Sequence, residues 1–148
     1  MIHVCYSLRD ESGKYSKFVA TSIHSILDNT SEDVTIHILH DSTLSEENRK
    51  KLFKLVHDFE QEILFYNVED LAIESVNKFW TVPQLKNVRH GVAMFYRLLI
   101  PTLLSKRISK AIYFDTDILT NCDVKDFWSI DLKEFPIAAV PESASGAA

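Results

Sequence analysis

Two aspartates, Asp115 and Asp117, directly follow a short apolar run at residues 111–114. This run of Ala, Ile, Tyr and Phe predicts a buried strand. Residues i and i+2 of an extended chain point to the same side, and two neighbouring carboxylates repel each other unless a cation lies between them. Mg²⁺ and Mn²⁺ prefer oxygen ligands of this kind and often bridge them to substrate phosphates. The spacing therefore indicates a metal–diphosphate site at the carboxyl end of a central strand, where open α/β sheets bind ligands.

The same pair of aspartates also fits a solvated acidic turn that ends a strand. A chain of this composition contains about one Asp-x-Asp pair by chance, so the pair alone is a weak motif. Its context is more specific, because an apolar strand precedes it and Asn121-Cys122-Asp123 follows after a short apolar step. A calcium loop of the EF-hand type is excluded, since its sixth position requires glycine and holds Thr120 here.

The composition predicts a globular protein of one domain. The 148 residues are 46% hydrophobic and 25% charged, which allows a core of useful size. A net charge of −5 argues against broad nucleic-acid binding, which requires a basic face. No apolar run approaches the ~20 residues of a transmembrane helix, and the first residues resemble a strand and not a signal peptide. We therefore expect a cytoplasmic protein with at most peripheral membrane contact.

The cysteines and glycines further limit the kinds of binding site that this chain can contain. Cys5 and Cys122 form no C-x-x-C motif and are expected to be two buried, reduced thiols. The chain has three glycines and neither a G-x-G-x-x-G nor a P-loop motif, which disfavours standard dinucleotide and P-loop sites.

Apolar patterns predict strands that alternate with helices, and hence a mostly parallel, doubly wound α/β sheet. The expected strands are residues 2–7, 34–39, 63–68, 111–115 and 136–140. Expected helices begin at Ser16, at the capping box of residues 43–46 and at Glu69, and a further helical stripe runs from Val92 to Leu103. Pro101 is expected to end or kink that stripe near Ile100, and Asp123 to cap a short helix through Trp128.

Four stretches of this sequence occur together in the same order in one known family. They are residues 2–7 followed by Asp10, Lys14 and Tyr15; residues 21–30; Phe95-Tyr-Arg-Leu-Leu-Ile-Pro101; and residues 112–123 followed by Phe127-Trp128. With these stretches the chain resembles glycosyltransferase family 8, the nucleotide-sugar-dependent enzymes that include bacterial lipopolysaccharide galactosyltransferases. The resemblance implies a Rossmann-like GT-A fold that binds a nucleotide diphospho-sugar.

The resemblance also implies which residues bind the donor. They are Ser7, Asp10, Tyr15, Arg97, Asp115, Thr116 and Asp117. Asp115 and Asp117 would be ligands of Mn²⁺ (or Mg²⁺) and link the ion to the diphosphate, and the main chain at Thr116 would lie near the ribose or uracil. Ser7 and Asp10 would contact the uracil with Tyr15 beside it. Arg97 would contact the sugar-phosphate end as a donor-orienting residue.

The implied reaction is transfer of a hexose from a UDP-sugar with retention of configuration, assisted by the metal, which stabilises the departing UDP. The acceptor would be a saccharide, a lipid-linked glycan or a glycoprotein, as in cell-surface polysaccharide biosynthesis. Two features depart from the family. The first loop, residues 8–14, is longer than usual, and the C-terminal histidine that supplies a third metal ligand is absent. We therefore expect residues 1–148 to be a single donor-binding domain whose acceptor-side portion is missing.

Other functions fit parts of the same pattern. A truncated, non-catalytic domain that binds UDP or a UDP-sugar is the principal alternative. An aspartyl-phosphate phosphatase also places Asp-x-Asp after a strand, but usually near the N-terminus with more acidic residues downstream. His37, His40 and Asp41 would make a second metal cluster only if side chains at i and i+3 of a strand shared a face, which they do not.

Overall fold

The computed structural model describes residues 1–71, 74 and 92–140. These residues form a four-stranded sheet in the order β3-β2-β1-β4. The strands are β1 (Ile2–Leu8), β2 (Val34–His40), β3 (Glu62–Asn67) and β4 (Ile112–Tyr113), and every neighbouring pair is parallel. The predicted parallel α/β sheet is therefore confirmed.

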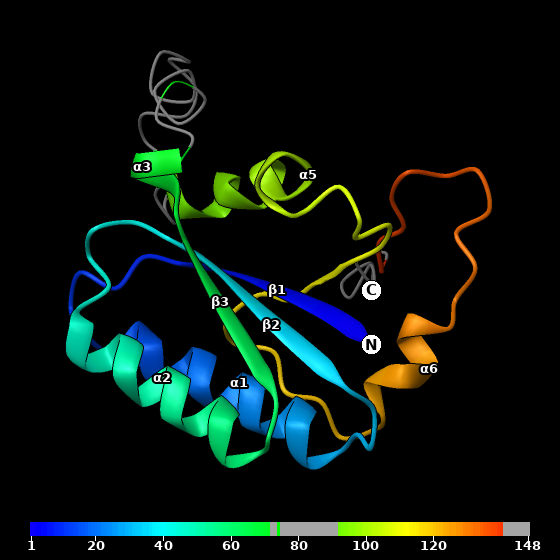
Figure 1. Cartoon of the computed structure of the whole chain (residues 1–148), viewed down its shortest axis with the longest axis horizontal. Coiled ribbons are helices and arrows are strands. Elements are labelled where there is room, and N and C mark those ends of the chain that lie inside the picture. Colours follow the sequence, from blue (N-terminus) through cyan, green and yellow to red (C-terminus); the bar gives the residue numbers. More distant parts are fainter. Residues whose placement is uncertain (72–73, 75–91, 141–148) are drawn as a thin grey trace, which may run out of the picture.

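Two long helices, α1 (Tyr15–Asp28) and α2 (Glu46–Asp58), cover one face of the sheet (Figure 1). Alternate residues of β1, from Ile2 to Leu8, point toward this face and join the main core. Every residue of β2 is buried, as expected for a central strand of a parallel sheet that is covered on both faces. The helical partners in this core are Val19, Ile23, Ile26, Leu27, Leu52 and Val56. The main core thus fixes the positions of β1 and β2, whose carboxyl ends lie at the edge of the sheet where the sequence predicted a site.

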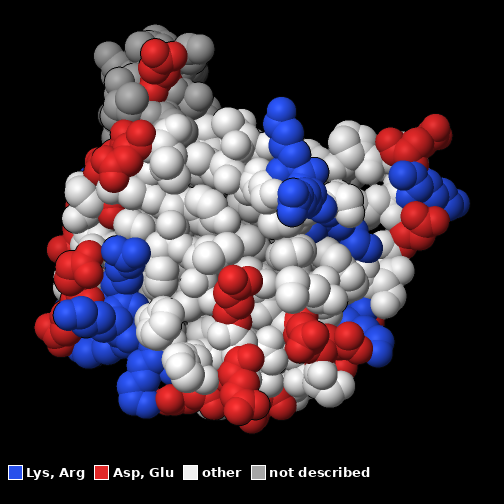
Figure 2. All heavy atoms as spheres, in the orientation of Figure 1, with Lys and Arg blue, Asp and Glu red and all other residues white. Residues whose placement is uncertain are grey.

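The exposed side of α2 carries charges of both signs that pair along the helix. Arg49 contacts Glu46, Lys51 contacts Glu47 and Lys54 contacts Asp58. Figure 2 shows Lys and Arg interspersed with Asp and Glu over this part of the surface. Exposed pairs of this kind contribute little to stability, so α2 is held in place mainly by its buried side.

The second face of the sheet is covered at its carboxyl end by η2 (Val92–Leu99) and α5 (Ile100–Leu103), with α3 (Val68–Leu71) nearby (Figure 1). A smaller apolar cluster lies beneath them and consists of Leu39, Val68, Val92, Tyr96 and Leu99. This cluster fixes η2 above the ends of β1 and β2, the edge at which the sequence predicted a site.

Several predicted boundaries change. Helix α2 is capped by Ser45, whose hydroxyl accepts a hydrogen bond from the Asn48 amide, and not by the predicted box at residues 43–46. Helix α1 begins at Tyr15, one residue before the expected Ser16 cap. Residues 136–140 form no strand, and no described strand is their partner, so the prediction of a fifth strand is wrong. Of the helix predicted for residues 69–79, the part beyond Leu71 lies almost wholly outside the described residues.

The helical stripe from Val92 to Leu103 is real but divides in two. Its first eight residues, η2, are a 3₁₀ helix. An α-helical turn, α5, follows, with Pro101 in its first turn, where the missing amide hydrogen removes no helical hydrogen bond. Asp123 caps α6 (Val124–Trp128) as predicted, by accepting a hydrogen bond from the Lys125 amide.

The two cysteines differ in exposure. Cys5 is buried in β1, whereas Cys122 is exposed, so the prediction of two buried thiols is half wrong. The reason is that Cys122 follows the short β4 in an exposed loop and not in the sheet. Within residues 1–71, 74 and 92–140, no helix is long and apolar enough to cross a membrane.

Candidate functional site

Three side chains from two segments of the chain meet where β4 ends. The Arg97 guanidinium on η2 donates a hydrogen bond from Nη2 to Asp115 Oδ1, at 2.8 Å. The same guanidinium lies over the Tyr113 ring, 4.4 Å from its centroid. The Tyr113 hydroxyl donates to the same Asp115 oxygen, at 3.1 Å. The fold therefore brings together Arg97 and Asp115, both predicted site residues, and adds Tyr113, which the sequence analysis did not identify.

Asp117 lies two residues beyond Asp115, in the turn closed by the hydrogen bond from the Ile118 amide to the Asp115 carbonyl, at 3.3 Å. Both carboxylates are exposed and half-buried Thr116 lies between them. Among the described residues, the Asp117 carboxylate and Asp115 Oδ2 make no hydrogen bond or ion pair. Their oxygens are therefore free to bind a hard cation.

These two carboxylates fit a divalent metal by their chemistry, but they supply only part of a coordination shell. Across the described part of the chain, no three His, Cys, Asp or Glu side chains gather closely enough to hold a metal ion. Mg²⁺ and Mn²⁺ commonly bind through one or two carboxylates, with water and substrate phosphates as the other ligands. The donor set at Asp115 and Asp117 suits this partial, open type of site.

Ser7 lies at the end of β1, beside Tyr113. Its side-chain oxygen is buried and has no hydrogen-bond partner among the described residues, although the Tyr113 hydroxyl is near. Burial raises the pKa of Tyr113 to about 12, so its phenol stays protonated and remains a donor at neutral pH. A buried, unpaired hydroxyl is costly, and a bound polar group is one way to satisfy it.

Asp10 and Tyr15 lie at the N-terminus of α1. Asp10 is buried, and its carboxylate accepts hydrogen bonds from the Tyr15 amide at 2.8 Å, the Ser16 hydroxyl and the Asn48 side chain at 3.0 Å. This carboxylate therefore caps α1 and joins it to α2. The Tyr15 ring is half exposed and lies edge-on to Phe18. A contact of either side chain with a base stays a prediction.

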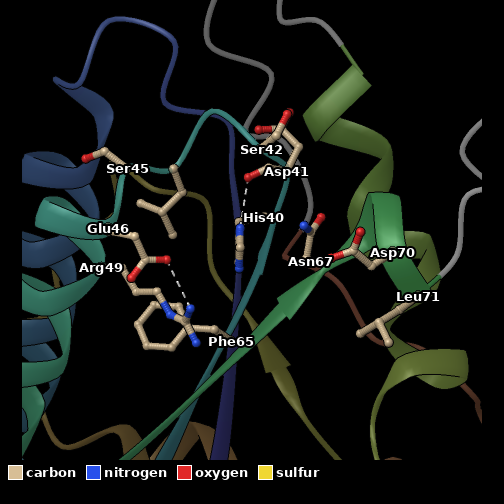
Figure 3. Close-up of a pocket in the computed structure, with 11 residues that line it drawn as sticks. His40, Asp41, Ser42, Ser45, Glu46, Arg49, Phe65, Asn67, Asp70 and Leu71 are labelled. Carbon is tan, nitrogen blue, oxygen red and sulfur yellow. Dashed lines mark hydrogen bonds and ion pairs between the residues drawn. The ribbon is translucent and has the colours of Figure 1, made fainter.

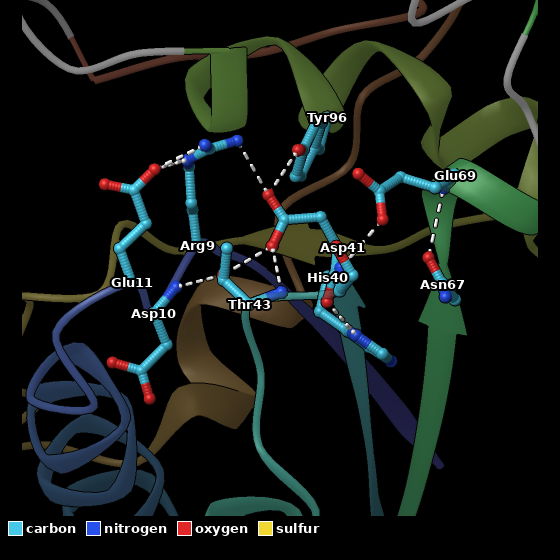
Figure 4. A network of polar contacts seen from close by, with 10 residues as sticks. Arg9, Asp10, Glu11, His40, Asp41, Thr43, Asn67, Glu69 and Tyr96 are labelled. Carbon is cyan, nitrogen blue, oxygen red and sulfur yellow. Dashed lines mark hydrogen bonds and ion pairs between the residues drawn. The ribbon is translucent and has the colours of Figure 1, made fainter.

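A buried carboxylate, Asp41, follows β2 (Figure 4), and the sequence analysis considered it only as a member of a disfavoured metal cluster. Asp41 Oδ2 accepts hydrogen bonds from Arg9 at 3.0 Å and from the Tyr96 hydroxyl at 2.9 Å. Asp41 Oδ1 accepts from the Thr43 amide, at 3.0 Å, and from its hydroxyl. An aspartate after a strand is usually a turn residue, so the sequence carries no signal that distinguishes this one.

The disfavoured cluster of His37, His40 and Asp41 does not form. His37 contacts His3 and Tyr66 on the sheet, whereas the His40 ring meets the Asp41 carbonyl. His40 and Asp41 instead belong to the lining of an open hollow where β2 and β3 end (Figure 3). This hollow also receives Arg49, which lies over the Phe65 ring, 5.0 Å from its centroid. None of the seven predicted donor-site residues lines it.

This chain resembles known proteins in sequence and in fold. Residues 5–147 match the sequence model of a family described as "Glycosyl transferase family 8". A candidate glycosyltransferase of Haemophilus influenzae is 30% identical over 125 residues, which are 84% of this chain and 35% of the relative. General stress protein A of Bacillus subtilis is 24% identical over 132 residues, or 87% of this chain and 43% of the relative.

Two solved structures show the same fold. The galactosyltransferase LgtC, solved in complex with donor and acceptor sugar analogues, superposes with a TM-score of 0.70 at 21% identity, over 89% of this chain and 44% of LgtC. Mouse xyloside xylosyltransferase 1 superposes with a TM-score of 0.57 at 14% identity, over 86% of this chain and 46% of that protein. The chain thus spans less than half the length of each of these relatives.

Proposed function

This chain belongs to glycosyltransferase family 8, and from that membership and the site geometry we propose that it is the donor-binding part of a hexosyltransferase. The enzyme takes a hexose from a UDP-sugar and transfers it, with retention of configuration, to a glycan, a lipid-linked acceptor or a protein-linked acceptor. A role in cell-surface polysaccharide biosynthesis and a cytoplasmic location are part of this proposal.

One observation carries the proposal. Arg97 reaches Asp115 across the end of the sheet, at 2.8 Å, while Asp117 beside it makes no hydrogen bond or ion pair with the described residues. One cation next to two carboxylates leaves a local charge of −1, which favours a divalent ion. The predicted metal ligands and the predicted donor-orienting arginine are thus within reach of one diphosphate.

The residues have separate tasks in this proposal. Asp115 and Asp117 would hold Mn²⁺ or Mg²⁺, which supplies the positive charge that stabilises the departing UDP. Arg97 pairs with Asp115 in the free protein and turns toward the sugar-phosphate end when the donor binds. Tyr113 keeps its proton and holds the Asp115 carboxylate in place through their 3.1 Å hydrogen bond.

The nucleoside would lie along the end of β1. The unpaired Ser7 hydroxyl would be a hydrogen-bonding group for the uracil, and the main chain at Thr116 would lie near the ribose or uracil. The half-exposed Tyr15 ring is available beside the base. For Asp10 we propose an indirect role, because its carboxylate already has three donors and caps α1.

A second candidate is a donor-binding domain that does not turn over by itself. It is favoured because the chain spans less than half of its relatives and because no third His, Cys, Asp or Glu among the described residues joins the two proposed metal ligands. The phosphatase alternative is set aside, since the family match extends over residues 5–147.

Calorimetric titration of UDP, with and without Mn²⁺, tests the proposal. We expect UDP to bind in the presence of Mn²⁺ and the binding to be lost when Asp115→Asn and Asp117→Asn are combined. Asp126→Asn removes an exposed carboxylate from the first turn of α6 and is the matched control, which should bind as the wild type does. Metal-independent binding, or binding that survives in the double variant, would contradict the assignment of the two aspartates.

A further inference from the structure

The buried carboxylate of Asp41 joins three segments that are far apart in sequence. Arg9 comes from the loop after β1, Thr43 from the loop after β2 and Tyr96 from η2 (Figure 4). Asp41 is 1% exposed and Tyr96 is also 1% exposed, so water does not replace these contacts easily. Burial, together with the charge of Asp41, raises the pKa of Tyr96, so the phenol keeps its proton and donates it in this hydrogen bond.

The η2 segment needs an external anchor because of its conformation. It is a 3₁₀ helix of eight residues, whereas 3₁₀ runs longer than about four residues are uncommon because their hydrogen bonds are poorly aligned. Its buried side chains, Val92, Tyr96 and Leu99, pack onto the sheet. Tyr96 supplies the polar contact at the centre of this packed side.

Tyr96 and Arg97 are neighbours on η2 and point to two different carboxylates. The Tyr96 hydroxyl reaches Asp41 at 2.9 Å, while Arg97 reaches Asp115 at 2.8 Å. Arg97 Nε also donates to the Met94 carbonyl at 2.8 Å, which directs the guanidinium along the helix. Because Tyr96 is anchored, the direction in which Arg97 leaves the helix is set.

We propose that Asp41 is a positioning residue that holds η2 through Tyr96, so that Arg97 points to the carboxylates at the end of β4. The role of Arg97 at the donor rests on the proposed function, whereas its placement by Asp41 does not. Asp41 touches neither substrate nor metal in this proposal, and acts only through Tyr96 and Arg97.

The helix geometry shows how much depends on this anchor. A 3₁₀ helix turns about 120° and rises about 2.0 Å per residue, against about 100° and 1.5 Å in an α-helix. If η2 relaxed to an α-helix, the five steps from Val92 would turn Arg97 by about 100° and shift it by about 2.5 Å along the axis. Such a change would break a 2.8 Å contact with Asp115.

The same carboxylate also holds the first loop. Arg9 donates to Asp41 and to Glu11, and the Asp10 amide donates to the Thr43 hydroxyl at 2.7 Å. The loop after β1 and the helix that carries Arg97 therefore share one anchor. Loss of Asp41 would disturb both sides of the proposed donor site, whereas loss of the Tyr96 hydroxyl would leave the contacts of Asp41 with Arg9 and Thr43 in place.

Hydrogen exchange of the Arg97 Nε–H group, measured by nuclear magnetic resonance without any ligand, tests the placement directly. The resonance is assigned by its loss in Arg97→Lys. We expect exchange to be faster by about tenfold or more in Tyr96→Phe and in Asp41→Asn. The buried hydrogen bond from Tyr96 to the charged Asp41 is lost in the first variant and weakened in the second. Tyr66→Phe, which removes one hydroxyl contact to His37 on the same sheet, is the control and should change exchange less than about twofold.

The affinity for UDP with Mn²⁺ supplies the second readout. If Tyr96 acts through Arg97, Tyr96→Phe weakens binding by about tenfold in the wild type and less than twofold when Arg97→Ala is already present. A folded Tyr96→Phe variant with unchanged Arg97 exchange would overturn the proposal, even if Asp41→Asn does not fold. Absence of UDP binding by the wild type would refute the proposed function and leave the exchange result to decide the role of Asp41.

Discussion

His37 should make the stability of this fold depend on pH. Its ring is fully buried on β2, where Nε2 meets His3 Nδ1 at 3.1 Å and Nδ1 meets the Tyr66 hydroxyl at 3.0 Å. Burial is the main cause that lowers the pKa of His37 from 6.5 to about 4, and the neighbouring His3 acts in the same direction. The folded protein therefore keeps this imidazole neutral under conditions in which the unfolded chain binds a proton there.

The size of the effect follows from the two pKa values. Because the folded pKa is the lower one, the contribution of His37 is fully present above pH 6.5 and is lost as the pH falls toward 4. Between pH 7.5 and pH 5.0, binding of this proton stabilises the unfolded state by about 2 kcal/mol relative to the folded state. The free energy of unfolding falls by the same amount. Other groups that face His37 include His3, Tyr66 and Cys5, with Glu62 and the N-terminus close to His3.

Urea unfolding at the two pH values measures the effect. The fall in free energy of unfolding from pH 7.5 to 5.0 should be smaller in His37→Gln than in the wild type by about 2 kcal/mol. His57→Gln, which replaces an exposed histidine of α2, should keep the wild-type pH dependence because His37 is retained. Equal pH dependence in the wild type and His37→Gln, within about 0.5 kcal/mol, would refute the reasoning.

Two further predictions concern local structure. An aromatic disulfide reagent at pH 8 should titrate one thiol quickly in the native chain, the exposed Cys122, and two after denaturation, because burial raises the pKa of Cys5 to about 12; two fast native thiols would contradict the burial of Cys5. Ser45→Ala should lower the free energy of unfolding by about 1 kcal/mol through loss of the α2 cap. The exposed Ser31→Ala should have little effect, and equal stability of the two variants would argue against Ser45 as the cap.

Much of the sheet could be predicted because its signals are local. The apolar patterns of β1, β2 and β3 appear in short windows of sequence, and β1 and β2 are almost wholly buried as their side chains indicate, whereas only Ile63 of β3 is buried. The cap of α6 by Asp123 was predictable for the same reason, since a cap contacts amides only two or three residues away. The family resemblance extended this reading to Arg97, which no local pattern marks.

The errors arose where a local signal was ambiguous or a partner was needed. Both Thr43 and Ser45 are acceptable caps by sequence, but the Thr43 hydroxyl is engaged by Asp41, which leaves Ser45 to cap α2. Residues 136–140 are apolar enough for a strand, yet a strand requires a neighbour for its backbone hydrogen bonds, and the described sheet offers none there. Likewise, a helical stripe shows which side is buried but not whether the helix is α or 3₁₀.

The sequence by itself determined the fold class, the buried strands β1 and β2, and the pair Asp115 and Asp117, since each depends on residue types a few positions apart. Only the tertiary structure decided which charges meet. It placed Arg97 against Asp115, 18 residues away, and Tyr96 against Asp41, 55 residues away. The physical reason is that the packing of distant segments decides which donors come close to a carboxylate, and a buried carboxylate such as Asp41 must be satisfied by such donors.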